Sequence, residues 1–310
     1  MIMQGWRTAM AALLVAPFLA GSAPARGEEP KMRLLANLRD LSISESSGLA
    51  VSRRHPGIIW THNDSGGLPA LYATDRTGAS IACVTIIGAK NVDWEDIAVG
   101  PDEMIYIGDF GDNGRSRSDT AIYALLEPPL NPALRDQQLA GGPAARYPFE
   151  YPDGHHDCET LLVHPVSGAI YVVTKEPSGE SGVYRYPMPL QRERQVTLER
   201  IATVRFALPL SFRGQPVGRL ATGGAFSPDG SRVAIRSYAE CFEWTIGKGQ
   251  TLAQSLAGRP RRIPVPMLGQ FESLCYTAEG RALLTTSEGS PCQLWEAPIP
   301  PAGSPAAGRQ

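Results

Sequence analysis

Five short segments share one pattern, and four of them carry carboxyl side chains near the start. Each segment has a polar residue at its third position, and apolar residues or glycine follow at every second position. Side chains two residues apart lie on the same face of a strand, so each segment is predicted to be a strand that is polar at its beginning and apolar further along. The five segments cover residues 45–51, 93–99, 157–163, 220–226 and 270–276.

If these strands surround a common axis, their first residues meet at one opening. Carboxylates held a few ångströms apart repel one another, and they either take up protons or share a cation. Oxygen ligands suit Ca²⁺, which binds about six to eight of them, better than they suit zinc. We therefore predict a calcium site at this opening, with the ligands Glu95, Glu159, Glu272 and Asp109.

A second group of polar residues is predicted to lie at the same opening, because antiparallel pairing places the end of a second strand beside the start of the first. We expect these residues to bind a small molecule or a loop of a partner protein. They are Glu45, Asn63, Asp64, Asp93, Asp112, Asp157, Lys175 and Glu288. The alternative is that the acids cap strand ends and accept main-chain N–H groups, which is a common structural use of such residues.

The surrounding sequence repeats with the five segments. Each segment is followed by a turn rich in proline or glycine and then by further apolar runs, as in a chain of hairpins. A four-stranded propeller blade takes about 40–50 residues, and the two longer intervals leave room for loops at 127–152 and 209–219. We predict an all-β fold, a five-bladed β-propeller of four-stranded antiparallel blades, with six blades as the alternative. Residues 32–38 are expected to complete the last blade and lock the ring.

The N-terminus indicates export. Arg7 precedes the apolar run 10–20, and Ala23-Pro24-Ala25 has the form of a signal-peptide cleavage site. We expect a signal peptide at 1–25, a propeller domain at 26–300 and a disordered tail at 301–310. The mature protein is then periplasmic or secreted, with no later segment apolar enough to span a membrane.

The charge composition bears on the class of molecule that the protein binds. The 29 basic and 31 acidic residues give a net charge of −2, which argues against nucleic-acid binding through phosphate contacts. We expect a monomer. The five cysteines leave at least one thiol free, and their pairing is open; they are Cys83, Cys158, Cys241, Cys275 and Cys292.

Four runs in the first half of the chain carry a family resemblance. They are ESSGLA at 45–50, WTHNDSG at 60–66, DWEDIA at 93–98 and GDFGDN at 108–113. Together they resemble secreted bacterial β-propellers of the phytase-like and SdiA-regulated type. The resemblance implies a propeller, export and calcium at the channel mouth. Propeller phytases have six blades and hold phosphate through calcium with lysine and arginine, whereas only five blades and few basic residues are evident here.

Two functions follow as hypotheses. The first is an exported propeller whose acidic, calcium-binding mouth binds a small ligand or a partner, with no reaction assigned. The alternative is a metal-dependent hydrolase of phosphoesters or lactones, in which the metal polarises the substrate and lowers the pKa of bound water. In the hydrolase, Asp64 or Glu45 would be the candidate base.

Overall fold

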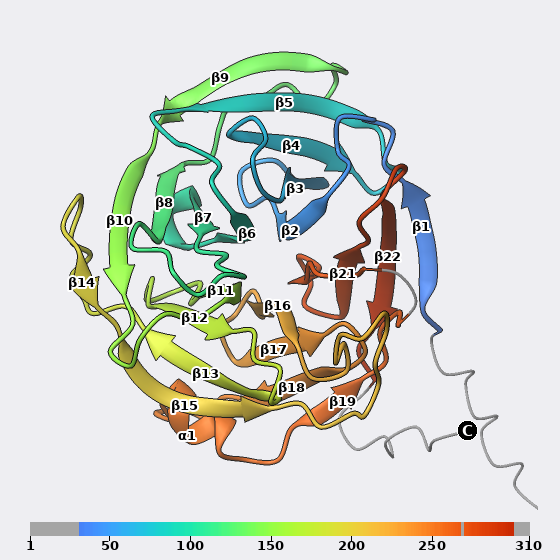
Figure 1. Cartoon of the computed structure of the whole chain (residues 1–310). Helices are drawn as coiled ribbons and strands as arrows, with labels where there is room; N and C mark the ends of the chain where they lie inside the picture. The colour runs from blue at the N-terminus through green and yellow to red at the C-terminus, as the bar shows by residue number, and fades with distance from the viewer. Residues whose placement is uncertain (1–30, 268–269, 301–310) are drawn as a thin grey trace, which may run out of the picture.

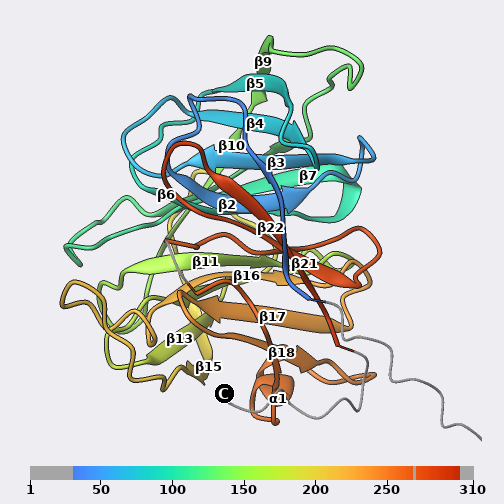
Figure 2. The ribbon, with the colours of Figure 1, turned by 90° about the vertical axis from the view of Figure 1, so that its right-hand side faces the viewer.

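The computed structural model describes residues 31–267 and 270–300, and these residues form five β-sheets arranged around a central channel (Figure 1). The five-bladed propeller predicted from the sequence is therefore confirmed, and the six-bladed alternative is wrong. The predicted signal peptide and C-terminal tail lie outside the described residues. In the side view the sheets of the blades lie one above another (Figure 2), and neighbouring sheets pack face to face.

Blades 1 and 2 each carry a fifth strand. Blade 1 consists, from the channel outward, of β2 (Ser46–Val51), β3 (Ile58–Asn63), β4 (Ala70–Asp75), β5 (Ser80–Ile87) and β9 (Gln137–Pro143). Blade 2 consists of β6 (Trp94–Val99), β7 (Met104–Asp109), β8 (Ala121–Leu126), β10 (Ala145–Glu150) and β14 (Val196–Thr197). A short 3₁₀ turn, η1 (Pro101–Glu103), joins β6 to β7. Both fifth strands, β9 and β14, pair in parallel with their neighbours, β5 and β10.

Blades 3, 4 and 5 have four strands each. Blade 3 is β11 (Cys158–Val163), β12 (Ile170–Thr174), β13 (Glu180–Arg185) and β15 (Glu199–Arg205). Blade 4 is β16 (Ala221–Phe226), β17 (Arg232–Ser237), β18 (Cys241–Thr245) and β19 (Arg261–Ile263), with the helix α1 (Leu252–Leu256) between the last two strands. Blade 5 is β20 (Cys275–Tyr276), β21 (Ala282–Thr286), β22 (Gln293–Pro298) and, as its outermost strand, β1 (Arg33–Asn37).

The ring is closed as predicted, by pairing the first described strand with the last. β1 lies antiparallel to β22. Arg33 also donates from Nε (3.0 Å) and Nη2 (2.7 Å) to Glu296 Oε1. The pairing with β1 covers the outer edge of β22, which would otherwise expose unpaired main-chain groups.

The expectation of a loop at 127–152 is wrong, because this segment contains β9 and β10. The high proline content of this stretch suggested a loop. A strand near the rim of a blade tolerates proline where one of its edges needs no hydrogen-bond donors. Phe149 in β10 is buried, and the centre of its ring lies 6.2 Å from that of Phe110. The expected loop at 209–219 contains no named strand.

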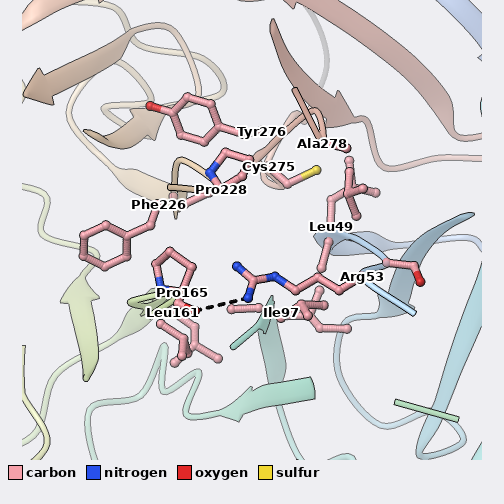
Figure 3. Close-up of a pocket in the computed structure, with 18 of the residues that line it drawn as sticks. Leu49, Arg53, Ile97, Leu161, Pro165, Phe226, Pro228, Cys275, Tyr276 and Ala278 are labelled. Atoms are coloured by element: carbon pink, nitrogen blue, oxygen red, sulfur yellow. Dashed lines mark hydrogen bonds between the residues drawn. The ribbon is translucent and has the colours of Figure 1, made fainter. Parts of the chain in front are cut away.

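Five buried apolar clusters hold the blades together, and one cluster lies at each interface between neighbouring blades. Trp60 of blade 1 and Trp94 of blade 2 are fully buried in the first of them. All five cysteines are free thiols, and none of them forms a disulfide. No helix among the described residues combines the length and apolarity that a membrane span requires. At the end of the channel opposite the acids the inner strands enclose a cavity of about 390 Å³ (Figure 3).

Candidate metal site at the acidic mouth

The inner strands present their first residues at one mouth of the channel, in the register that the sequence predicts. In blades 1 to 4 the start of each inner strand pairs with the end of the second strand, and in blade 5 an isolated bridge ahead of β20 takes this place. The pairs are Ser46 with Asn63, Trp94 with Asp109, Cys158 with Thr174, Ala221 with Ser237 and Phe271 with Ser287. In the first four blades the register shifts just after this pair, so a β-bulge follows each strand start.

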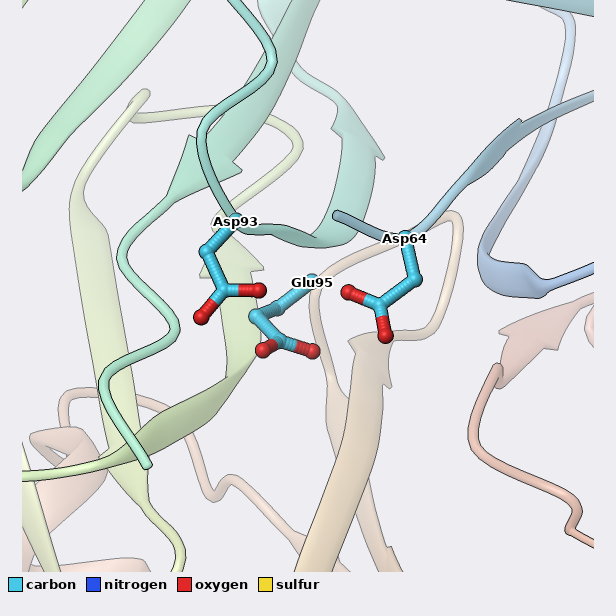
Figure 4. Close-up of side chains that lie close together, drawn as sticks. All are labelled: Asp64, Asp93 and Glu95. Atoms are coloured by element: carbon cyan, nitrogen blue, oxygen red, sulfur yellow. The ribbon is translucent and has the colours of Figure 1, made fainter. Parts of the chain in front are cut away.

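Five carboxyl groups from three blades converge at this mouth. Oxygens of Asp64, Asp93 and Glu95 lie within 4.8 Å of one another, and Figure 4 shows the three groups turned toward a common point. Oxygens of Glu95, Asp157 and Glu159 also lie within 4.8 Å of one another. Glu95 belongs to both triads, so the five groups form one cluster that we call the acid cluster.

The second triad is buried. The exposed fractions of Glu95, Asp157 and Glu159 are 3%, 6% and 3%. Glu159 Oε2 and Asp64 Oδ1 are buried oxygens with no hydrogen-bond donor among the described residues. A buried carboxylate oxygen without a donor is costly, and a cation bound among these oxygens would remove that cost.

Gly111 brings the main chain close to the acid cluster. A Cβ atom at this position would overlap the carboxylates of both Glu95 and Asp93. The Gly111 N–H also donates to Asp93 O at 3.1 Å. Only glycine therefore lets the loop after β7 pass over the two carboxylates without displacing them.

Lys175 is the basic side chain that contacts the acid cluster. Its ammonium group donates to Glu159 Oε1 and lies 5.8 Å from the centre of the Tyr238 ring. One ammonium group thus faces five carboxyl groups, and it leaves Glu159 Oε2 without a partner. The residual charge is negative, which favours a divalent cation.

The carboxyl pKa values reflect this crowding. Burial, followed by the charges of Glu272 and Asp93, raises the pKa of Asp64 to about 7. Burial, followed by the charges of Asp64 and Asp93, raises the pKa of Glu95 well above its usual range. Burial also raises the pKa of Asp93, although Arg117 opposes the shift. Without a cation, the acid cluster therefore retains protons at a pH where ordinary carboxyl groups have lost them.

Three predicted site residues have other partners. Asp109, predicted as a metal ligand, accepts the Asp93 N–H and an N–H of Arg117, both at 3.0 Å through Oδ1. Asp112 accepts the N–H groups of Ser116 (2.9 Å) and Arg117 (2.8 Å) and so fixes its own loop. Asn63 accepts the Ser44 N–H at 3.0 Å and holds the entry to β2. In these three places the structural use of polar residues accounts for the side chain.

Glu272, the fourth predicted ligand, lies on the blade 5 side of the mouth and is not part of either triad. It accepts the Tyr238 hydroxyl at 2.5 Å. Its charge raises the pKa of Asp64, and burial together with Glu272 raises the pKa of the neighbouring Glu288 to about 9. Glu45 is exposed; its main-chain oxygen accepts the Asp64 N–H at 2.9 Å, and its charge raises the pKa of Asp64. Glu272, Glu288 and Tyr238 thus form a second polar group beside the acid cluster.

Sequence reasoning missed Asp96. This fully buried residue accepts the N–H of Ile97 at 2.8 Å and the N–H of Leu161 at 2.9 Å. Strict alternation would point Asp96 away from the channel when Glu95 points toward it, but the β-bulge between Trp94 and Asp96 breaks the alternation. The only indication of Asp96 in the sequence was that DWEDIA, at 93–98, contains a third acidic residue beside Asp93 and Glu95.

Comparisons with known proteins give similarity at low sequence identity. A scan against protein-family models finds no match for this chain, and neither does a search of curated proteins. Among solved structures, the chain is similar to the PQQ-bound form of an aldose sugar dehydrogenase from Streptomyces coelicolor, with 12% identity, a TM-score of 0.47, and coverage of 89% of this chain and 99% of that chain.

Two further solved structures are similar at the same level. A gluconolactonase from Xanthomonas campestris is 17% identical over 82% of this chain and 72% of its own, with a TM-score of 0.45. The WD40 repeats of RRP9 are 10% identical over 87% of this chain and 99% of their own, with a TM-score of 0.45.

Proposed function

We propose that this protein is an exported propeller that binds Ca²⁺ in the acid cluster and uses the bound ion to hold a small anionic ligand. The observation that carries the proposal is the buried triad of Glu95, Asp157 and Glu159, in which Glu159 Oε2 has no donor among the described residues. Acid groups alone are common on protein surfaces. A buried carboxylate oxygen turned into a cluster of other carboxylates requires a proton or a cation.

Calcium suits the donor set better than other common cations. Every group of the acid cluster offers oxygen, and no histidine or cysteine takes part. Ca²⁺ accepts variable oxygen geometry, whereas Mg²⁺ demands a near-ideal octahedron and zinc prefers nitrogen and sulfur. Calcium modules outside the cell bind with Kd values of about 0.1–1 mM, and export of this chain would fit an affinity in that range.

The ligand is proposed to be an anion because two positive charges would lie side by side at the mouth. Lys175 already contacts the acid cluster, and its side chain is 13% exposed. A phosphate or carboxylate group could contact the bound ion and the ammonium group together. Tyr238, below the ammonium group, would flank such a ligand.

The experiment is a calcium titration of protein first treated with EDTA, followed by calorimetry and thermal unfolding. Wild type is expected to bind one Ca²⁺, and Glu159→Gln is expected to lose at least about tenfold in affinity, because a ligand charge is removed from a buried site. Glu199→Gln, on the exposed outer strand of the same blade, is the matched control and keeps wild-type affinity. Absence of calcium binding by the wild type, or equal affinity in Glu159→Gln, contradicts the proposal.

The alternative function is a metal-dependent hydrolase of phosphoesters or lactones. Lys175 favours it, since an ammonium group beside a metal site can stabilise the charge that develops on a substrate oxygen. Lys175→Met separates the two functions. In a hydrolase this variant loses turnover of a phosphoester or lactone while it still binds calcium, whereas the binding protein shows no turnover even as wild type.

A further inference from the structure

The channel end opposite the acid cluster contains the cavity of about 390 Å³. Small-molecule sites in proteins usually measure about 300–1,000 Å³, so the cavity is large enough for a ligand. It is lined by the far ends of the inner strands and by the turns that follow them. The two ends of the channel therefore differ in chemistry, and a ligand here would not touch the acid cluster.

The walls of this cavity are mainly apolar. Leu49, Ile97 and Leu161 line its deep end, and Phe226 and Tyr276 line it nearer the opening (Figure 3). The Tyr276 hydroxyl already donates to Glu243 at 2.8 Å, so this residue offers the cavity its ring. Such walls favour a hydrocarbon chain or an aromatic ring over a sugar or a nucleotide.

Arg53 is the exception among these apolar walls. Its main-chain N–H donates to the buried carboxylate of Glu127 at 3.3 Å, and its side chain reaches across the opening from blade 1 to blade 3. There Nη1 donates to Pro165 O at 3.1 Å, as Figure 3 shows. Within residues 31–267 and 270–300, this is the only hydrogen bond of the guanidinium group, and no carboxylate oxygen lies within 4.0 Å of it.

A second arginine, Arg236, has a guanidinium group that donates several hydrogen bonds. Arg236 is completely buried, and it donates to main-chain oxygens of Ser237 (3.0 Å), Tyr238 (3.4 Å) and Pro266 (3.4 Å) and to Thr285 Oγ1 (2.5 Å). Arg53 has one such partner because its side chain is exposed at the opening, where water reaches its other N–H groups. Its remaining N–H groups are available to a ligand.

We propose that this cavity binds a small apolar molecule that carries a carboxylate, with the hydrocarbon part between the inner strands and the carboxylate on Arg53. A guanidinium group binds a carboxylate through two parallel hydrogen bonds, which the neutral carbonyl of Pro165 cannot match. Glu279 also lines the opening and is exposed, as Arg53 is, so water and salt weaken both the repulsion of an anion by Glu279 and its attraction to Arg53.

Octanoate and 1-octanol are the probes for this site. They share a hydrocarbon chain and differ in charge, and both are titrated by calorimetry with EDTA present, so that calcium at the other mouth plays no part. Wild type is expected to bind octanoate at least about tenfold more tightly than 1-octanol, because a hydrogen bond to a charged group contributes about 1.5–3 kcal/mol. Arg53→Met is expected to lower octanoate affinity to that of 1-octanol.

Two further variants make the result specific. Arg281→Met removes an exposed positive charge from the turn between β20 and β21 and is expected to leave octanoate binding unchanged. Val99→Phe fills the cavity from a half-buried wall position and is expected to abolish binding of both probes. Val51→Phe, at the equivalent wall position of blade 1, replaces it if the first variant does not fold. No octanoate binding by wild type, wild-type affinity in Arg53→Met, or retained binding in the filled variant would overturn the proposal.

Discussion

The side chain of Asp96 accepts the main-chain N–H of Leu161 at 2.9 Å, so a buried carboxylate of blade 2 joins the inner strand of blade 3. Asp96 also accepts the main-chain N–H of Ile97, in its own strand, at 2.8 Å. Asp96 therefore connects the inner strands of blades 2 and 3 inside the channel. It lies between the acid cluster on one side and the apolar cavity on the other.

Removing this connection is expected to destabilise the whole ring. In Asp96→Ala, the N–H groups of Ile97 and Leu161 lose their acceptor in a buried place, and each such loss costs about 1–3 kcal/mol. Chemical denaturation should show a lower free energy of unfolding by several kcal/mol. Glu150→Ala, an exposed change on β10 of the same blade, should stay within about 0.5 kcal/mol of wild type. Equal stability of Asp96→Ala and wild type would contradict this role.

Gly111→Ala is expected to damage the acid cluster without changing any carboxyl group. The added methyl group must displace the carboxylates of Glu95 and Asp93, because a Cβ atom there overlaps both. Calcium titration should show affinity at least about tenfold weaker, since ligand positions at a metal site tolerate little displacement. Gly142→Ala is the control, because nothing lies within 4 Å of a Cβ atom at that position. Unchanged calcium affinity in Gly111→Ala would show that the loop after β7 does not set the ligand positions.

The effect of calcium on stability is expected to increase with pH. The pKa of Asp64 is about 7 in the folded, metal-free protein and 3.8 in an ordinary carboxyl group, so between these values the folded state holds a proton that the unfolded chain has lost. Raising the pH through this window therefore lowers the free energy of unfolding of metal-free protein. Calcium competes with the protons and reverses that loss.

The measurement is the difference in Tm with calcium and with EDTA. At a calcium concentration of about 100 times Kd, binding contributes about 2.7 kcal/mol near neutral pH, which is a shift of several degrees. Near pH 5 the shift should be much smaller, because protons occupy the acid cluster. A calcium shift that is the same at both pH values would contradict calcium binding at these carboxyl groups.

Deleting the outermost strand of blade 5 is expected to make the protein less stable and more prone to associate. A chain that begins at Leu38 lacks β1 and exposes the edge of β22, and free edges of this kind pair with other chains. Size-exclusion chromatography should show larger species, and thermal unfolding should show a lower Tm. A chain that begins at Lys31 is the control and keeps β1. Monomeric, equally stable protein without β1 would mean that the pairing with β22 contributes little.

The sequence predicts the propeller and the register of its inner strands because both depend on local patterns. Alternating polar and apolar residues place Glu95 and Glu159 on the channel face, and the spacing of the turns indicates the number of blades. The outer strands were harder to predict, as β9 and β10 show. Pairing at the rim of a propeller depends on which neighbouring edge is free, and composition does not encode that.

The candidate site was predictable in part, because the same local patterns set which side chains reach the mouth. The sequence places Asp64, Asp93, Glu95, Asp157 and Glu159 at one mouth, and the structure brings them together. The sequence does not reveal that Asp109 and Asp112 accept hydrogen bonds from main-chain N–H groups and from Arg117, because those hydrogen bonds depend on how one loop folds back. The position of Asp96 depends on a β-bulge that no alternation pattern shows.

The closure of the ring has a consequence for biosynthesis. Arg33 and Glu296 are separated by 263 positions in the chain, so the partner of the first strand leaves the ribosome only after almost everything else has been translated. Until then blade 5 lacks its strands, and neither mouth of the channel has a complete rim. A nascent chain of this design therefore stays an open arc for most of translation.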